Sequence, residues 1–158
     1  MSLKNTDARV RQVYEQWHDA VRKRDAQAAA ALYTENAIIE SPAVWVFNRQ
    51  SDGFLRGRRA IETYFETFIT RLGSTKNWFC DGQFLSDGEL LMWEYLRETP
   101  DGDQNDVIES IDLAGGLIAH HRVYWGWIGI KGFMDKLGVP KPQFQAAPFD
   151  GKRPVIPS

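Results

Sequence analysis

The spacing of hydrophobic residues changes once along this chain, and no other feature of the sequence constrains the fold as strongly. Up to Gly73 they recur every three or four residues, which is the period of a helix with one buried face. From Trp78 onwards they alternate with polar residues, which is the period of a strand. Helices followed by strands predict an α+β domain, in which three helices from the N-terminal half pack on one face of an antiparallel sheet.

Start and stop signals divide these two regions into elements. Thr6 and Asp7 suit the start of a first helix, Asp25 the start of a second, and Gly73 the end of a third. A strand at 37–41 stops at Pro42 and is followed by a long loop. The remaining expected elements are strands at 78–85, 89–98, 106–113 and 117–127 and a short helix near 129–138.

One domain accounts for the chain apart from its C-terminal end. A length of 158 residues with 43% hydrophobic residues suits a single core. Five of the seven prolines fall at 139–158. We therefore expect one domain at 1–138 and a Pro-rich tail at 139–158, extended and either draped on the domain or partly disordered.

Charge and cysteine content exclude several classes of protein. Lys and Arg (19) nearly balance Asp and Glu (21), for a net charge of −2, so no nucleic-acid partner is expected. No apolar window reaches the length of a membrane span, and the N-terminus lacks a secretory signal, so no membrane association is expected. The single cysteine, Cys80, cannot form an internal disulfide, which favours a cytoplasmic location. Without a phosphate-binding loop or metal-ligand spacing, we expect no cofactor and no metal ion.

Hairpin geometry brings three polar residues of the strand region together. A two-residue turn at Asp101-Gly102 places Glu109 opposite Glu94, and a turn centred on Gly115 places Glu109 opposite His121. The three would form one polar row on an otherwise apolar face. Two facing carboxylates cannot both ionise cheaply, and an imidazole beside them can relay a proton, so the row indicates acid–base chemistry. The alternative is a buried structural network, and a one-residue register slip would turn all three outwards.

The aromatic content points to a cavity and to a second covered face. Aromatic residues make up 13% of the chain and include six tryptophans. The expected outer face of the sheet also carries large apolar residues, and no helix remains to cover it. We therefore expect a homodimer through this face, with a draped C-terminal tail as the alternative. The expected dimer residues are Trp93, Tyr95, Ile108 and Tyr124.

Three motifs resemble the NTF2-like superfamily, particularly its SnoaL-like polyketide cyclases and ketosteroid isomerases. They are VYEQWHDAVRKRDAQAAAALYTENAIIESP near the N-terminus, LRGRRAIETYFETF in the third helix, and DVIESIDLAGGLIAHHRVYW in the last hairpin. The resemblance implies an NTF2-like cone, a curved antiparallel sheet with three helices whose mouth holds an apolar ligand. Because this fold hosts many chemistries, the resemblance specifies the reaction poorly.

The isomerase site carries over only in part. Its oxyanion-holding tyrosine falls at Trp17, which can still donate through its indole N–H. Its base aspartate falls at Ser41, which has no carboxylate, so the resemblance puts steroid isomerisation in doubt. Its neutral aspartate falls at Glu109, which preserves a carboxyl. His121 and Trp125 fall at positions that line the pocket.

Together these observations predict a cofactor-independent acid–base enzyme of the isomerase, cyclase, dehydratase or hydrolase type. Its substrate would be a small apolar or aromatic molecule. The alternative is a non-catalytic module that binds a hydrophobic metabolite. Trp45 and Phe47 are expected to form a lid in the loop at 43–57. The predicted catalytic residues are Glu109, His121 and Glu94, and the predicted substrate-binding residues are Trp17, Ser41, Trp45, Phe65, Met92, Val123 and Trp125.

Overall fold

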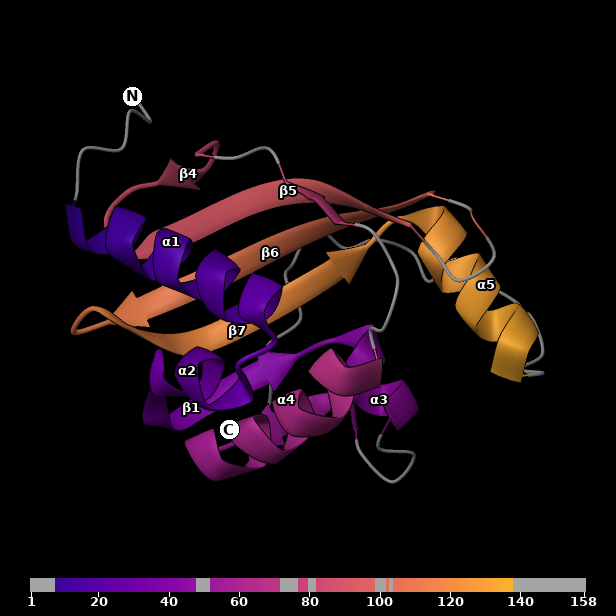
Figure 1. The fold of residues 1–158 in the computed structure, drawn as a ribbon, viewed down its shortest axis with the longest axis horizontal. Helices are drawn as coiled ribbons and strands as arrows, with labels where there is room; N and C mark the ends of the chain where they lie inside the picture. Colours follow the sequence, from indigo (N-terminus) through magenta and orange to yellow (C-terminus); the bar gives the residue numbers. More distant parts are fainter. Residues whose placement is uncertain are drawn as a thin grey trace, which may run out of the picture.

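The computed structural model describes residues 8–47, 52–71, 77–79, 82–98, 102 and 104–137. Helices predominate in the first half of the chain and long strands in the second, as the change of period predicts (Figure 1). The helices are α1 (Ala8–Lys23), α2 (Ala26–Ala31), α3 (Pro42–Phe47), α4 (Arg58–Arg71) and α5 (Trp127–Leu137). The strands are β1 (Tyr33–Glu40), β2 (Phe54–Arg56), β3 (Asn77–Phe79), β4 (Leu85–Ser86), β5 (Leu90–Glu98), β6 (Gln104–Ala114) and β7 (Leu117–Trp125).

The strands form one curved sheet in the order β2-β1-β7-β6-β5-β3, with β4 paired to β5 (Figure 1). The long strands β5, β6 and β7 make the expected antiparallel meander. β1 runs parallel to β7, however, so the sheet is mixed rather than wholly antiparallel. A parallel pair needs a long connection, and the chain between β1 and β7 supplies it.

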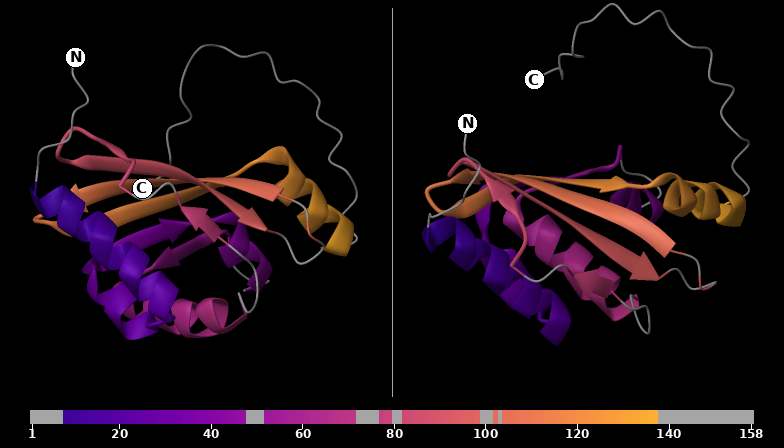
Figure 2. Two further views of the ribbon diagram at one scale, coloured as in Figure 1. Left: turned by 45° about the horizontal axis from the view of Figure 1, so that its top comes forward. Right: turned by 90° about the horizontal axis from the view of Figure 1, so that it is seen from above.

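Helices α1, α2 and α4 cover one face of this sheet (Figure 2). α1 buries Val10, Val13 and Trp17, and the Trp17 ring centroid lies 5.1 Å from that of Trp93 on β5. Asp25 caps α2 as predicted, because its carboxylate accepts a hydrogen bond of 2.8 Å from the backbone N–H of Ala28. The core therefore lies between these helices and the inner face of the sheet.

The segment predicted as a loop at 43–57 contains two short elements, α3 and β2. β2 pairs antiparallel with the end of β1, where Leu55 lies opposite Ile39. The strand predicted at 78–85 is divided into β3 and β4, and both pair with β5. The tail at 139–158 lies outside the described residues.

The last helix, α5, rests against β6 through a glycine. A Cβ atom at Gly129 would overlap the side chain of Asn105, which is buried on β6. Gly132, one turn further along α5, has nothing near the position of its missing Cβ. The close approach of helix to strand therefore depends on Gly129.

The register between β5 and β6 differs by one residue from the prediction. Trp93 lies opposite Glu109, and Glu94 lies opposite Ile108. The last pair is Glu98 with Gln104, so five residues connect the strands rather than a two-residue turn. An odd change in loop length exchanges the two faces of a strand. The predicted pairing of Glu94 with Glu109 is therefore wrong, and Glu94 is exposed on the outer face.

The register between β6 and β7 differs by two residues, which preserves the face. Gly115 and Gly116 form the turn with φ of +60° and +82°, a left-handed backbone that suits glycine. A bulge between Asp112 and Leu113 then shifts the pairing, so that Ile111 lies opposite His121 and Glu109 opposite Val123. Glu109 and His121 are therefore diagonal neighbours on the inner face.

Candidate functional site

A small cavity of about 50 Å³ lies between the helices and the inner face of the sheet. Its walls come from α1, α4, β1, the start of α3 and the three long strands. Most of the lining is aromatic or aliphatic, and among the described lining residues Glu109 is the only carboxylate. The lining residues are Trp17, Val21, Ile39, Ser41, Ala43, Tyr64, Phe65, Phe68, Tyr95, Arg97, Glu109, His121, Val123 and Trp125.

A chain of three short hydrogen bonds runs across the inner face beside this cavity. Nδ1 of His121 lies 2.6 Å from the Tyr33 hydroxyl, and its Nε2 lies 2.6 Å from Oε2 of Glu109. The Tyr95 hydroxyl donates to the other carboxylate oxygen of Glu109 at 2.9 Å. Four strands thus contribute to one polar unit, with Tyr33 on β1, His121 on β7, Glu109 on β6 and Tyr95 on β5.

This unit is almost completely removed from solvent. Glu109 and His121 are 3% and 2% exposed, and Tyr33 is fully buried. Burial raises the pKa of the Tyr33 and Tyr95 hydroxyls well above the usual value, and the charge of Glu109 adds to this effect. Both tyrosines therefore stay protonated at neutral pH and can act as hydrogen-bond donors.

The geometry assigns different capacities to the imidazole and the carboxyl group. Both ring nitrogens of His121 already have partners within the protein, so neither is left for a ligand. Each carboxylate oxygen of Glu109 has one partner, and a carboxylate has about four lone-pair sites in total. Glu109 is therefore the member of the unit that can also contact a molecule in the cavity.

Trp17 and Tyr64 add polar atoms to the apolar walls. Burial has the largest effect on the pKa of the Tyr33 hydroxyl and raises it, whereas the nearby indole N–H of Trp17 lowers it. The indole N–H itself has no hydrogen-bond partner among the described residues. Burial raises the pKa of the Tyr64 hydroxyl, which lies near Glu109, Arg97 and Ser41. Both groups can therefore donate a hydrogen bond to a ligand.

The cavity brings together most of the residues predicted from the sequence. Those that line it are Glu109, His121, Trp17, Ser41, Phe65, Val123 and Trp125. Glu94 and Met92 lie on the outer face of β5 because of the register difference. Trp45 is 45% exposed on α3 and does not line the cavity. The Phe47 side chain lies outside the described residues.

Sequence reasoning missed four polar residues of the site, namely Tyr33, Tyr64, Tyr95 and Arg97. Tyr64 is one of the buried-face residues of the third helix, and only the cavity distinguishes it from core. Tyr33 begins β1, four residues before the strand expected at 37–41. Tyr95 and Arg97 follow Trp93 on the inner face, which the predicted register turned outwards. A five-residue connection between β5 and β6, in place of the two-residue turn, would have placed Tyr95 and Arg97 on the inner face.

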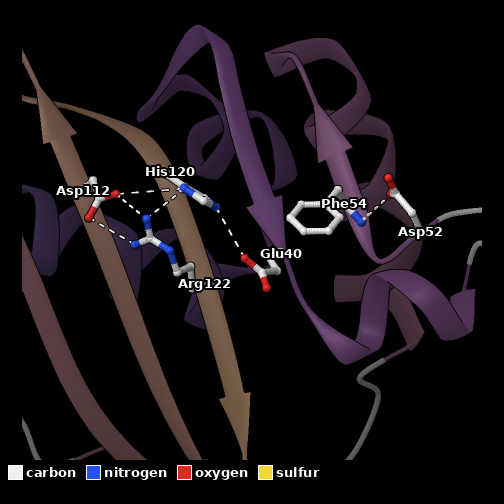
Figure 3. A network of polar contacts seen from close by, with 6 residues as sticks. All are labelled: Glu40, Asp52, Phe54, Asp112, His120 and Arg122. Atoms are coloured by element: carbon white, nitrogen blue, oxygen red, sulfur yellow. Dashed lines mark hydrogen bonds and ion pairs between the residues drawn. The ribbon is translucent and has the colours of Figure 1, made fainter. Parts of the chain in front are cut away.

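The outer face carries a separate polar network at the strands β1, β6 and β7 (Figure 3). Arg122 forms a paired contact with the carboxylate of Asp112, at 2.6 and 3.1 Å, and its guanidinium also lies 2.9 Å from Nδ1 of His120. Nε2 of His120 is 3.6 Å from Oε2 of Glu40. Burial, together with the charge of Arg122, lowers the pKa of His120, so its imidazole is neutral at pH 7. The network thus pairs Arg122 with Asp112 and links both, through His120, to Glu40 on the neighbouring strand.

The proposed dimer residues are divided between the two faces. Trp93 and Tyr95 are buried in the core, so their assignment to the outer face is wrong for the same register reason. Ile108 and Tyr124 do lie on the outer face, opposite each other, and are 37% and 52% exposed.

The described residues include neither a metal-binding cluster nor a membrane-spanning helix. No group of three or more His, Cys, Asp and Glu residues there could hold a metal ion. No described helix is both long enough and apolar enough to cross a bilayer.

Comparison with known proteins identifies the fold. Residues 14–121 match the model of the SnoaL-like domain family. A SnoaL-like protein of unknown function from Burkholderia thailandensis aligns with a TM-score of 0.62 and 16% identity, over 77% of this chain and 97% of that one. An NTF2-like protein of unknown function from Mesorhizobium loti aligns with a TM-score of 0.63 and 18% identity, over 80% and 99%.

A third structure belongs to an enzyme. It is the epoxide hydrolase/cyclase-like enzyme SalBIII, which has a role in pyran ring formation in the polyether salinomycin. It aligns with a TM-score of 0.55 and 22% identity, over 75% of this chain and 92% of that one. No curated protein sequence matches the chain. The predicted NTF2-like fold is confirmed. Because the family model covers well over half of its length, the chain belongs to the SnoaL-like domain family.

Proposed function

We propose that this protein is a cofactor-independent acid–base enzyme that acts on a small apolar or aromatic molecule, with Glu109 as its proton-transfer group. The observation that carries the proposal is the buried chain Tyr33–His121–Glu109–Tyr95 at the wall of an apolar cavity. A carboxyl group that hydrogen bonds hold in place at the wall of an apolar cavity is oriented for proton transfer with a molecule bound there.

The residues joined by these hydrogen bonds have distinct roles. Glu109 is the catalytic residue, since it is the carboxylate among the described residues that line the cavity. His121 is a positioning residue, because it contacts Glu109 and Tyr33 through its two nitrogens. When Glu109 takes a proton from substrate, one carboxyl oxygen carries the proton and the hydrogen bond between Oε2 and Nε2 of His121 is kept. Tyr33 keeps the ring in place in either state, since a hydroxyl both donates and accepts.

A single carboxyl group favours reactions in which one residue takes a proton and returns it to another atom of the same substrate. Isomerisation is the simplest of these, and dehydration or ring closure follow the same pattern. Ser41, at the position of the family's base aspartate, supplies no second carboxylate. The fold similarity to an epoxide hydrolase/cyclase-like enzyme supports the same class of chemistry.

The size of the cavity limits the substrate. A cavity of about 150 Å³ accommodates a benzene ring, whereas this one measures about 50 Å³. A one-ring substrate therefore requires wall residues to move apart. Phe68 and Trp125 are only partly buried and can move in this way.

A direct test uses proton abstraction from a generic substrate. In nitrobenzisoxazole a base removes the ring C–H proton, the electron pair forms a nitrile, and the N–O bond breaks to give a nitrophenolate whose absorbance reports the rate. We expect the wild-type protein to exceed acetate at equal concentration, and Glu109→Gln to lower its rate at least about 100-fold.

The matched control is Glu94→Gln, which makes the same chemical change on the outer face of the same sheet. Its rate should equal that of the wild type. A wild-type rate no higher than that of acetate would contradict the enzymatic proposal and favour a non-catalytic module that binds a hydrophobic metabolite.

We further propose that the protein is a homodimer through the outer face, now centred on Ile108 and Tyr124, and that it is cytoplasmic. The exposure of these two apolar side chains on neighbouring strands supports the dimer. The single cysteine supports the location.

A further inference from the structure

Arg97 lies near the end of β5 and lines the same cavity as Glu109. Its guanidinium carbon is 5.7 Å from the centroid of the Phe68 ring, a cation–π contact that orients the group within the aromatic wall. Tyr64 and Tyr95 also border the cavity beside it. A permanent positive charge is thus placed at the wall of a mostly apolar cavity.

No carboxylate in the described part of the chain lies within ion-pair distance of this charge, although the charge of Glu109 acts on it and raises its pKa against the larger effect of burial. Two other arginines have such a partner: a guanidinium nitrogen of Arg58 is 2.9 Å from a carboxylate oxygen of Glu35, and one of Arg122 is 2.6 Å from a carboxylate oxygen of Asp112. Arg97 forms no ion pair or hydrogen bond with any described carboxylate, although burial is strong enough to lower its pKa. A guanidinium remains charged under such conditions and carries five N–H donors, so the missing acceptors represent unused binding capacity.

The surroundings specify which anion fits. A guanidinium pairs with a carboxylate through two parallel hydrogen bonds in one plane, which suits a narrow cavity between flat rings. Phosphate esters are larger and carry up to two charges, and Glu109 in the same cavity would repel the second charge. A planar monoanion is therefore the best match to the site.

We propose that the ligand of this cavity carries a carboxylate group that Arg97 binds, with its apolar part among the aromatic residues and its reacting atoms at Glu109. This inference rests on the proposed use of the cavity as the substrate site. It narrows the substrate class from small apolar molecules to small unsaturated or aromatic carboxylic acids.

The test compares benzoate with benzamide, which share a ring and a planar head group but differ in charge. Isothermal titration calorimetry at pH 7 should show that the wild type binds benzoate at least about tenfold more tightly than benzamide. Arg97→Gln should lose this preference, and Arg97→Lys should retain part of it because the charge remains. The control Arg59→Gln removes an exposed arginine outside the cavity and should leave both affinities unchanged.

Equal affinities in the wild type, no binding of benzoate, or a preference that survives in Arg97→Gln would overturn the carboxylate proposal. Circular dichroism of each variant shows whether it is folded. If Arg97→Gln is unfolded, the benzoate preference of Arg97→Lys decides the outcome. The Glu109→Gln variant separates the two proposals. It should abolish proton transfer yet keep or strengthen the benzoate preference, because it removes a negative charge from the cavity. The proton-transfer rate therefore tests the proposed function, and the benzoate preference separately tests the carboxylate proposal.

Discussion

At the scale of single residues, the site depends on a tyrosine that never contacts the cavity directly. Tyr33 is fully buried, is not among the cavity-lining residues, and its hydroxyl reaches the site through His121. Its hydroxyl occupies the one nitrogen of His121 that Glu109 does not. The orientation of the imidazole ring toward Glu109 is therefore held in part from β1.

Removing this hydroxyl should weaken both the fold and the acid–base unit. In Tyr33→Phe a buried imidazole nitrogen loses its partner, and we expect the free energy of unfolding in urea to fall by about 1–3 kcal/mol. Tyr124→Phe, the same change at an exposed tyrosine, should stay within about 0.5 kcal/mol of the wild type. The NMR signals of the His121 ring nitrogens should shift in the first variant only. An unchanged ring spectrum in Tyr33→Phe would show that the hydroxyl does not bind the His121 ring in solution.

The sequence predicts some of these residue contacts and not others, for a reason that lies in the strand period. Glu109 and His121 were placed together correctly because an error of two residues leaves a side chain on the same face. Glu94 and Tyr95 were exchanged because an error of one residue does not. Tyr33 pairs with a residue 88 positions away, and no local pattern reports such a contact.

At the scale of elements, two glycines of α5 differ in the space around the position of a Cβ atom. Gly129 lies against the buried Asn105 side chain, whereas Gly132 faces open space. We expect Gly129→Ala to lower the free energy of unfolding by about 1–3 kcal/mol through overpacking. Gly132→Ala should raise it by about 0.5–1 kcal/mol, because alanine is the better helix former. Equal effects of the two substitutions in urea unfolding would refute the packing of α5 on β6.

Element types were more predictable than their connections. The helical period identified α1, α2 and α4, and alternation identified β5, β6 and β7. α3 and β2 were expected as loop because each is only a few residues long, too short for either period to appear. The bulge after Asp112 also leaves no distinctive residue in the sequence.

At the scale of the whole molecule, the sheet has one face covered by helices and one that exposes Ile108 and Tyr124 (Figure 2). If this outer face joins two copies, the wild type should sediment as a dimer at micromolar concentration. Ile108→Lys should then sediment as a monomer, because a charge would be buried without a partner. Ile128→Lys places the same charge on α5, at a residue that is 50% exposed, and should remain dimeric. A monomeric wild type would refute the dimer.

The parallel pairing of β1 with β7 is the feature of overall architecture that the sequence did not predict. The geometry of hairpins predicts pairing only between strands that follow one another in sequence. β1 and β7 are separated by most of the other elements of the domain. The resemblance to the NTF2-like superfamily provided the cone-shaped fold, and the comparisons with solved structures confirm it.

The hairpin of β6 and β7 carries both Glu109 and His121, only twelve residues apart and joined through a two-glycine turn. Their place on one hairpin is therefore encoded locally, whereas much of the cavity wall comes from α1 and α4. Insertions or substitutions in those distant segments can reshape the wall without disturbing the pair. Descendants of this chain could thus exchange one ligand for another and inherit the proton-transfer unit intact.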